Sequence, residues 1–224
     1  IGSARIADIR QPGLERVVEF ELEHLNELGD PCKKVLIMEL MGKHSNIIFC
    51  DDKGMILDSI KHVSSHMSSV REVLPGREYF IPQTQDKLNP LTVSEEDFIN
   101  TVCRKPCNIS KALYSSLTGI SPVVAEEICF RASIDGSDAA QSLDETAQIH
   151  LYHTFCRLMD QVKERDFTPN IIYRGEEPVE YGVLPFQQYG PEYHSVKFDS
   201  VSSMLETYYA TKNTLTRIHQ KSSD

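Results

Sequence analysis

The hydrophobic pattern of this 224-residue chain changes its period twice, and this limits the folds open to it. Up to about residue 90, apolar residues alternate with polar ones or form short runs, as in "LERVVEFELE" at 14–23. Such alternation is typical of half-buried β-strands. From Ser94 to about Arg165 the spacing becomes helical, and strands resume after Pro169. The pattern predicts an α+β protein, a β-rich domain interrupted by helices.

These changes set the predicted domain boundaries. We expect residues 1–90 and 168–199 to form one β-rich domain, 91–167 a helical domain, and 200–224 the start of a coiled coil. The last prediction rests on apolar residues spaced alternately three and four apart, at Val201, Met204, Tyr208, Thr211, Leu215 and Ile218. The alternative is a helix that caps the β domain.

The segment 109–132, "ISKALYSSLTGISPVVAEEICFRA", predicts two helices joined by a tight turn. Gly119 suits the end of the first helix, while Ser121 suits the N-cap of the second, with Pro122 at its first position. The spacing matches a helix–hairpin–helix unit, whose backbone amides commonly meet a phosphate. Its turn would be Thr118, Gly119, Ile120 and Ser121. The alternative is a corner between helices that serves only packing.

Charge and motifs exclude several functions. The net charge of −10 argues against a uniformly basic nucleic-acid binder. Locally, however, residues 33–77 carry seven Lys and Arg against five acids. Six cysteines without a C-x-x-C pair suit reduced thiols in the cytosol. With no P-loop, G-x-S-x-G or H-E-x-x-H, we expect no catalytic site, cofactor or metal. No apolar run approaches 18 residues, so no membrane contact is expected.

The stretch 39–63, "ELMGKHSNIIFCDDKGMILDSIKHV", gathers polar residues between apolar runs. The runs flank Asp51–Gly54, which predicts a β-hairpin that brings Ser45 and Lys61 to the same end. Lysine and histidine can meet phosphate oxygens there. The candidate RNA- or ribosome-binding residues are Lys43, His44, Ser45, Asn46, Lys61, His62 and Arg71. The alternative is a turn with polar side chains, whose histidines are buried and fix the turn.

Four segments together resemble the NFACT family, whose bacterial members are called RqcH or fibronectin-binding protein A. They are "QPGLERVVEFEL", "ELMGKHSNIIFCDDKGMILDSIKHV", "VLPGREYFIPQ" and "FDSVSSMLETYYATKN", in this order along the chain. The resemblance implies that the sequence starts partway through an NFACT-N domain, continues through a helix–hairpin–helix domain, and reaches the start of a coiled coil. The family's acidic–Arg pair matches Glu15 and Arg16, implied to bind tRNA, with Glu in place of the usual Asp.

The resemblance also implies a function. The protein would bind the large ribosomal subunit that carries stalled peptidyl-tRNA, and recruit alanyl-tRNA for C-terminal alanine tailing of the nascent chain in the cytoplasm. One alternative is a surface adhesin that binds fibronectin or fibrinogen. A lesser alternative is a DNA-processing protein built on the helix–hairpin–helix.

Overall fold

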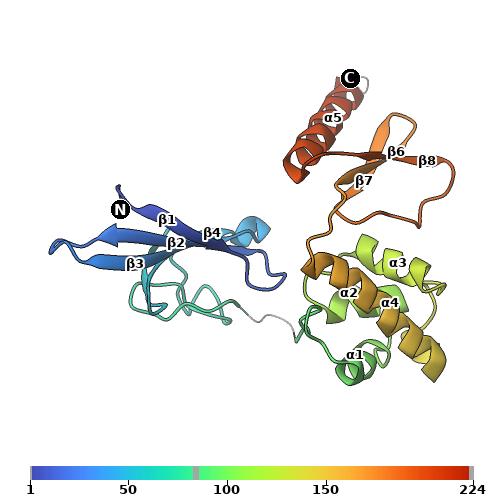
Figure 1. Ribbon diagram of the computed structural model, residues 1–224, viewed down its shortest axis with the longest axis horizontal. Helices are drawn as coiled ribbons and strands as arrows, with labels where there is room; N and C mark the ends of the chain where they lie inside the picture. Colours follow the sequence, from blue (N-terminus) through green and yellow to red (C-terminus); the bar gives the residue numbers. More distant parts are fainter. Residues whose placement is uncertain (1, 83–85, 222–224) are drawn as a thin grey trace. The chain divides into compact units, whose positions relative to one another are not determined.

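The computed structural model describes residues 2–82 and 86–221, which divide into two compact units. The first unit contains residues 1–89 together with 116–119, and the second contains 90–115 and 120–224. The strands form two separate sheets, one in each unit, and most of them are labelled in Figure 1.

The first unit is an antiparallel five-stranded sheet whose strand order follows the sequence. Its strands are β1 (Arg5–Arg10), β2 (Val17–Leu25), β3 (Pro31–Glu39), β4 (Asn46–Asp51) and β5 (Ile56–Ser59). The predicted hairpin about Asp51–Gly54 is confirmed: the Asp51 carboxylate accepts from the Lys53 and Met55 amides, and Gly54 takes the positive φ that the turn requires.

One face of this sheet carries the buried core of the unit. Val17, Ile37, Ile48, Cys50 and Ile56 gather there, and the segment 63–81 covers them with Val73, Val63, Tyr79 and Ile81. In β2 the apolar residues Val18, Phe20 and Leu22 alternate with glutamates and share one face. Register places these on the opposite face, because Glu19 lies across from the core residue Ile37. The predicted alternation is confirmed, and Leu22 on this second face is also buried, at 7% exposure, but the core cluster of the unit lies on the face that carries Val17.

The strand β1 was not predicted from the sequence. A β-bulge between Ile6 and Asp8 shifts its register. Ile6 therefore lies opposite Leu22 while Ile9 lies opposite Phe20, so two isoleucines three residues apart share one face. A bulge hides the period-two alternation by which a strand is recognised in sequence.

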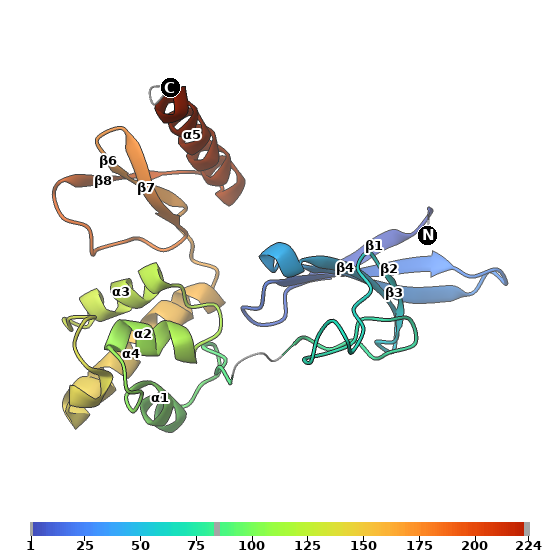
Figure 2. The ribbon, with the colours of Figure 1, turned by 180° about the vertical axis from the view of Figure 1, so that it is seen from behind.

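The second unit begins with helices that pack around a helix of 19 residues (Figure 2). They are α1 (Glu95–Val102), α2 (Ile109–Ser116), α3 (Pro122–Arg131) and α4 (Glu145–Lys163). Ser94 and Ser121 cap α1 and α3 through their side chains, as predicted. Phe98 of α1 stacks on Phe155 of α4 at 4.9 Å between ring centroids, and both rings are buried. Aromatic contact and burial together hold α1 against α4.

The three strands that follow do not join the first sheet, which corrects the predicted domain organisation. β6 (Asn170–Arg174) lies between β7 (Glu177–Gly182) and β8 (Tyr193–Lys197) in a sheet of their own, grouped with the helices. A buried carboxylate explains the grouping. Glu127 on α3 pairs with Arg131 and accepts the amides of Gln187 and Gln188, in the connection from β7 to β8. Sequence order alone could not reveal this attachment.

The last helix, α5 (Val201–Lys221), packs against β7 and β6 of the second sheet. Met204 is buried there, and the Tyr208 ring lies edge-on to that of Tyr181. The first part of the predicted heptad seam therefore covers the chain's own sheet, as in the alternative of a capping helix. Farther along, Ile218 is 57% exposed. The coiled coil stays a prediction, and its last residues, 222–224, lie outside the described residues.

Candidate nucleic-acid interface

Two of the segments singled out in the sequence, 11–22 and 39–63, meet at one end of the first sheet. Arg16 immediately precedes β2, and its carbonyl accepts the Leu40 amide at 2.9 Å. Glu39, the last residue of β3, lies opposite both Val17 and Asn46. Lys61 follows the end of β5, bonded to the Asn46 side chain. The ends of four neighbouring strands thus bring together segments separated by up to 45 residues. We call the set Arg16, Lys43, His44, Lys61 and His62 the basic end.

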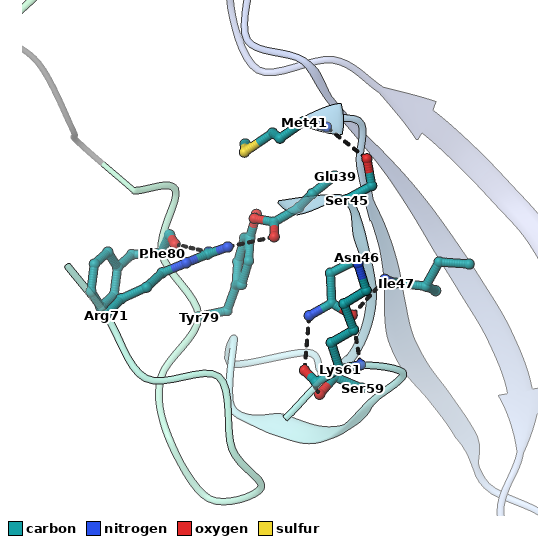
Figure 3. A network of polar contacts seen from close by, with 10 residues as sticks. All are labelled: Glu39, Met41, Ser45, Asn46, Ile47, Ser59, Lys61, Arg71, Tyr79 and Phe80. Carbon is teal, nitrogen blue, oxygen red and sulfur yellow. Dashed lines mark hydrogen bonds and ion pairs between the residues drawn. The ribbon is translucent and has the colours of Figure 1, made fainter. Parts of the chain in front are cut away.

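The turn that carries Lys43 and His44 is a short 3₁₀ helix, Gly42–His44. Gly42 adopts a φ of +56°, a backbone conformation that side chains with a Cβ rarely accept. The Ser45 hydroxyl accepts the Met41 amide at 2.9 Å and closes the turn (Figure 3). Ser45 therefore shapes the backbone here, whereas the prediction made it a donor to RNA.

The expected placement of the 43–45 turn and Lys61 at the same end of the hairpin is confirmed. The Lys61 ammonium donates to the Lys43 carbonyl at 3.1 Å, although the two residues are 18 apart in sequence. Lys43 and His44 are exposed. Among the described residues Lys43, Lys61 and Arg16 have no ion-pair partner, so their charges stay available to an anion. The interpretation of His44 and His62 as buried turn-fixing residues is wrong, since both are exposed.

His62 is the member of the basic end that has a carboxylate partner. Its Nε2 lies 2.9 Å from Asp58 Oδ1, and both side chains are more than half exposed. The hydrogen bond from His62, with a second from the Ser59 amide, holds the pKa of Asp58 below its ordinary value. His62 is thus the least available of the set for an outside phosphate.

Arg71 points inward and is not a free cation, contrary to the prediction that it binds RNA. Its guanidinium pairs with Glu39 Oε1 and donates to the Phe80 carbonyl at 2.6 Å, as Figure 3 shows. The Tyr79 hydroxyl donates to the other oxygen of Glu39 at 2.9 Å. The Glu39 side chain is fully buried and that of Arg71 is 11% exposed. Burial, then the Glu39 carboxylate, raises the pKa of Tyr79.

Glu39 and Tyr79, which form this cluster with Arg71, were not singled out in the sequence, although it held a signal for Glu39. Glu39 is a lone acid that follows the apolar run "VLIM" at 35–38. A buried carboxylate requires a cationic or hydrogen-bonding partner. That rule predicts a partner for Glu39 without naming it, because Arg71 and Tyr79 come from a segment without regular secondary structure.

The remaining predicted residues lie beside this end or elsewhere. Glu15 is half-buried, and its backbone takes part in a turn through the Pro12 carbonyl and the Gln11 side chain. In the helical hairpin, α2 ends at Ser116, three residues before the predicted cap Gly119. The Thr118 amide donates to the Leu88 carbonyl at 3.0 Å and is therefore not free for a phosphate. Phosphate binding by the turn 118–121 stays a prediction.

Residues 1–224 match the family described as NFACT N-terminal and middle domains. The chain belongs to the NFACT family. It is 33% identical over 220 residues to the "Rqc2 homolog RqcH" of Bacillus subtilis, covering 98% of this chain and 36% of the relative. A second relative of the same name, from Streptococcus suis, is 32% identical over 222 residues, covering 99% of this chain and 35% of that protein. This NFACT chain thus spans about a third of these relatives.

Solved structures agree with this NFACT assignment. The N-terminal structure of the fibronectin/fibrinogen-binding protein from Streptococcus suis superposes with a TM-score of 0.68 at 31% identity, covering 93% of this chain and 68% of that one. The fibrinogen-binding protein from Staphylococcus aureus gives 0.71 at 26% identity, covering 92% and 70%. None of the helices in ranges 2–82 and 86–221 has the length and apolar character needed to cross a membrane.

Proposed function

We propose that this NFACT chain is part of a cytoplasmic ribosome-associated quality-control factor. The factor binds the large ribosomal subunit with its stalled peptidyl-tRNA and recruits alanyl-tRNA for C-terminal alanine tailing. Relatives named RqcH, matched over nearly all of this chain, support the assignment. The observation that carries the RNA-binding part is the basic end of the first sheet, where Arg16, Lys43 and Lys61 gather without ion-pair partners among the described residues.

Electrostatics explains how such a site works on an acidic protein. The chain carries a net charge of −10, which repels the RNA backbone at a distance and discourages indiscriminate binding. A few unpaired cations at one sheet end contact phosphates locally and release counterions. The chain's role is to hold RNA in position, and the proposal assigns it no catalytic residue.

The test compares two double variants of the full-length protein expressed in its own cytoplasm. Lys43→Ala with Lys61→Ala removes two charges from the basic end. Lys34→Ala with Lys53→Ala removes the same charge near Asp51, at the opposite end of β4. We expect only the first to reduce the large-subunit RNA and tRNA that copurify, and to lower the salt dependence of tRNA binding by up to about 2 in log–log slope.

Equal RNA recovery from both double variants would overturn the assignment of the site. Arg16→Ala, which removes an exposed side chain, should also reduce copurifying tRNA without lowering the melting temperature. A large stability loss with tRNA retained would show that Arg16 is structural.

The adhesin function is the second candidate, since two solved relatives are named for binding fibronectin or fibrinogen. The two candidates differ in what the purified protein captures. Immobilised full-length protein is offered ribosomal subunits with tRNA, or fibronectin and fibrinogen, at the same ionic strength. Retention of matrix protein alone favours the adhesin, and cleavage of added duplex DNA would favour the DNA-processing alternative.

A further inference from the structure

Asn46 has a side chain that is committed to its own protein. The residue is 8% exposed, and its Oδ1 accepts two amides, from Ile47 at 2.9 Å and from Lys61 at 3.0 Å. Its Nδ2 donates to the Lys61 carbonyl at 2.9 Å. Both backbone groups of Lys61 are therefore bound by one amide side chain. This differs from the prediction that Asn46 itself contacts RNA, because these contacts turn its polar atoms inward (Figure 3).

The position of these bonds shows what they accomplish. The backbone pairing of β4 with the chain after β5 ends at the hydrogen bond from the Ile60 amide to the Ile47 carbonyl, at 3.0 Å. At the next residue, Lys61, the Asn46 side chain supplies both the acceptor and the donor that a strand would have supplied. The Ser59 hydroxyl donates to the same Lys61 carbonyl at 2.9 Å. The chain is thus held in place one step beyond its last regular strand.

The Lys61 side chain is fixed as well as its backbone. Its ammonium donates to the Lys43 carbonyl, in the turn that leads back to Asn46. A free lysine side chain samples many rotamers, and ordering it on binding costs conformational entropy. Much of that cost is met before a ligand arrives if the protein already holds the lysine. Preorganised groups bind more tightly for this reason.

We infer that Asn46 is a positioning residue, which fixes Lys61 against the Lys43 backbone so that the Lys61 charge meets an RNA phosphate from a set position beside the Lys43 turn. The inference rests on the proposed function, because it takes the basic end as the RNA-binding site. It assigns Asn46 a role through Lys61, without direct contact to RNA.

The experiment measures binding of unfractionated deacylated tRNA to the full-length protein over a series of KCl concentrations. Asn46→Ala is compared with Lys61→Ala and with the double variant. We expect each single variant to weaken binding and to lower the log–log salt slope by about 0.5–1, because one phosphate contact contributes about 0.9. The double variant should be no weaker than Lys61→Ala, since a residue that acts only through Lys61 has no effect once Lys61 is gone.

Asn170 offers a matched control for the loss of a buried amide. It is 1% exposed in the second unit, and its Nδ2 donates to the carbonyls of Thr168, Gly182 and Leu184. Asn170→Ala should destabilise its own sheet but leave the salt slope unchanged. Equal slope losses in Asn46→Ala and Asn170→Ala would overturn the inference.

The outcomes separate the two proposals. An unchanged slope in Asn46→Ala with a lowered slope in Lys61→Ala overturns the inference and leaves the proposed function standing. An unchanged slope in both variants removes the basic end as the RNA site, and with it the inference. If Asn46→Ala does not fold, Ser59→Ala removes the other side-chain bond to the Lys61 carbonyl. Ser59→Ala should lower the salt slope by a smaller amount than Asn46→Ala. An unchanged slope in Ser59→Ala would overturn the inference.

Discussion

The inward orientation of Arg71 makes a prediction opposite to that of an RNA-binding arginine. Arg71→Met keeps an apolar stem of similar length but removes the guanidinium. Glu39 then stays buried with the Tyr79 hydroxyl as its remaining partner from this cluster. Removing one member of a buried ion pair costs about 3–5 kcal/mol. Because proteins of this size are stable by only about 5–15 kcal/mol, the loss is a large part of the total.

Two companion variants separate this effect from the loss of a charge. Glu39→Gln with Arg71→Met removes both charges while the new amide oxygen can still accept from Tyr79, so we expect a loss of only about 1–2 kcal/mol. Arg77→Met serves as the matched surface control. Arg77 pairs with Glu72 at 2.9 Å but is 62% exposed, so its loss should cost less than about 1 kcal/mol.

Native-state hydrogen exchange of the β3 and β4 amides is the assay, since it reports the opening of the first sheet independently of the second unit. A loss of 3–5 kcal/mol lowers protection by about two to three and a half orders of magnitude. The reasoning is refuted if Arg71→Met leaves exchange unchanged and weakens tRNA binding instead. Arg71 would then be the RNA contact that the sequence suggested.

Two further predictions concern a glycine and the thiols. At Gly119 (φ +76°) an added Cβ would lie 2.7 Å from Leu14 Cβ, whereas at Gly54 (φ +84°) it meets open space. Gly119→Ala should therefore lower the free energy of unfolding by about 2–4 kcal/mol, and Gly54→Ala by about 1 kcal/mol. Urea denaturation measures both values, and equal losses would contradict the close packing at Gly119. Burial raises the pKa of the Cys129 thiol to about 12. Iodoacetamide at pH 8 should alkylate it at least ~100-fold more slowly than half-exposed Cys32, with a rate that rises as pH rises, and similar rates would refute this.

Local features of this protein could be predicted from the sequence because short-range chemistry decides them. Ser94 and Ser121 cap their helices through hydroxyls three residues from the amides they satisfy. The Asp51–Gly54 turn needs only its own side chain and a glycine. That turn also brought Lys43 and Lys61 together, since antiparallel pairing aligns the two ends of a hairpin. The same local rules failed at β1, where a bulge shifts the period.

Only the tertiary structure decided which face of a strand is buried, which residues pair, and which sheet a strand joins. Alternation in β2 says that the two faces differ, but the covered face is the one that the segment 63–81 packs on, carrying Val17 and Ile37. Arg71 is a surface cation or a buried partner depending on whether its neighbours bring Glu39 within reach. β6 belongs with the helices α1–α4 because Glu127 on α3 ties its sheet to them. Each outcome depends on contacts between distant residues, whose energies no local pattern contains.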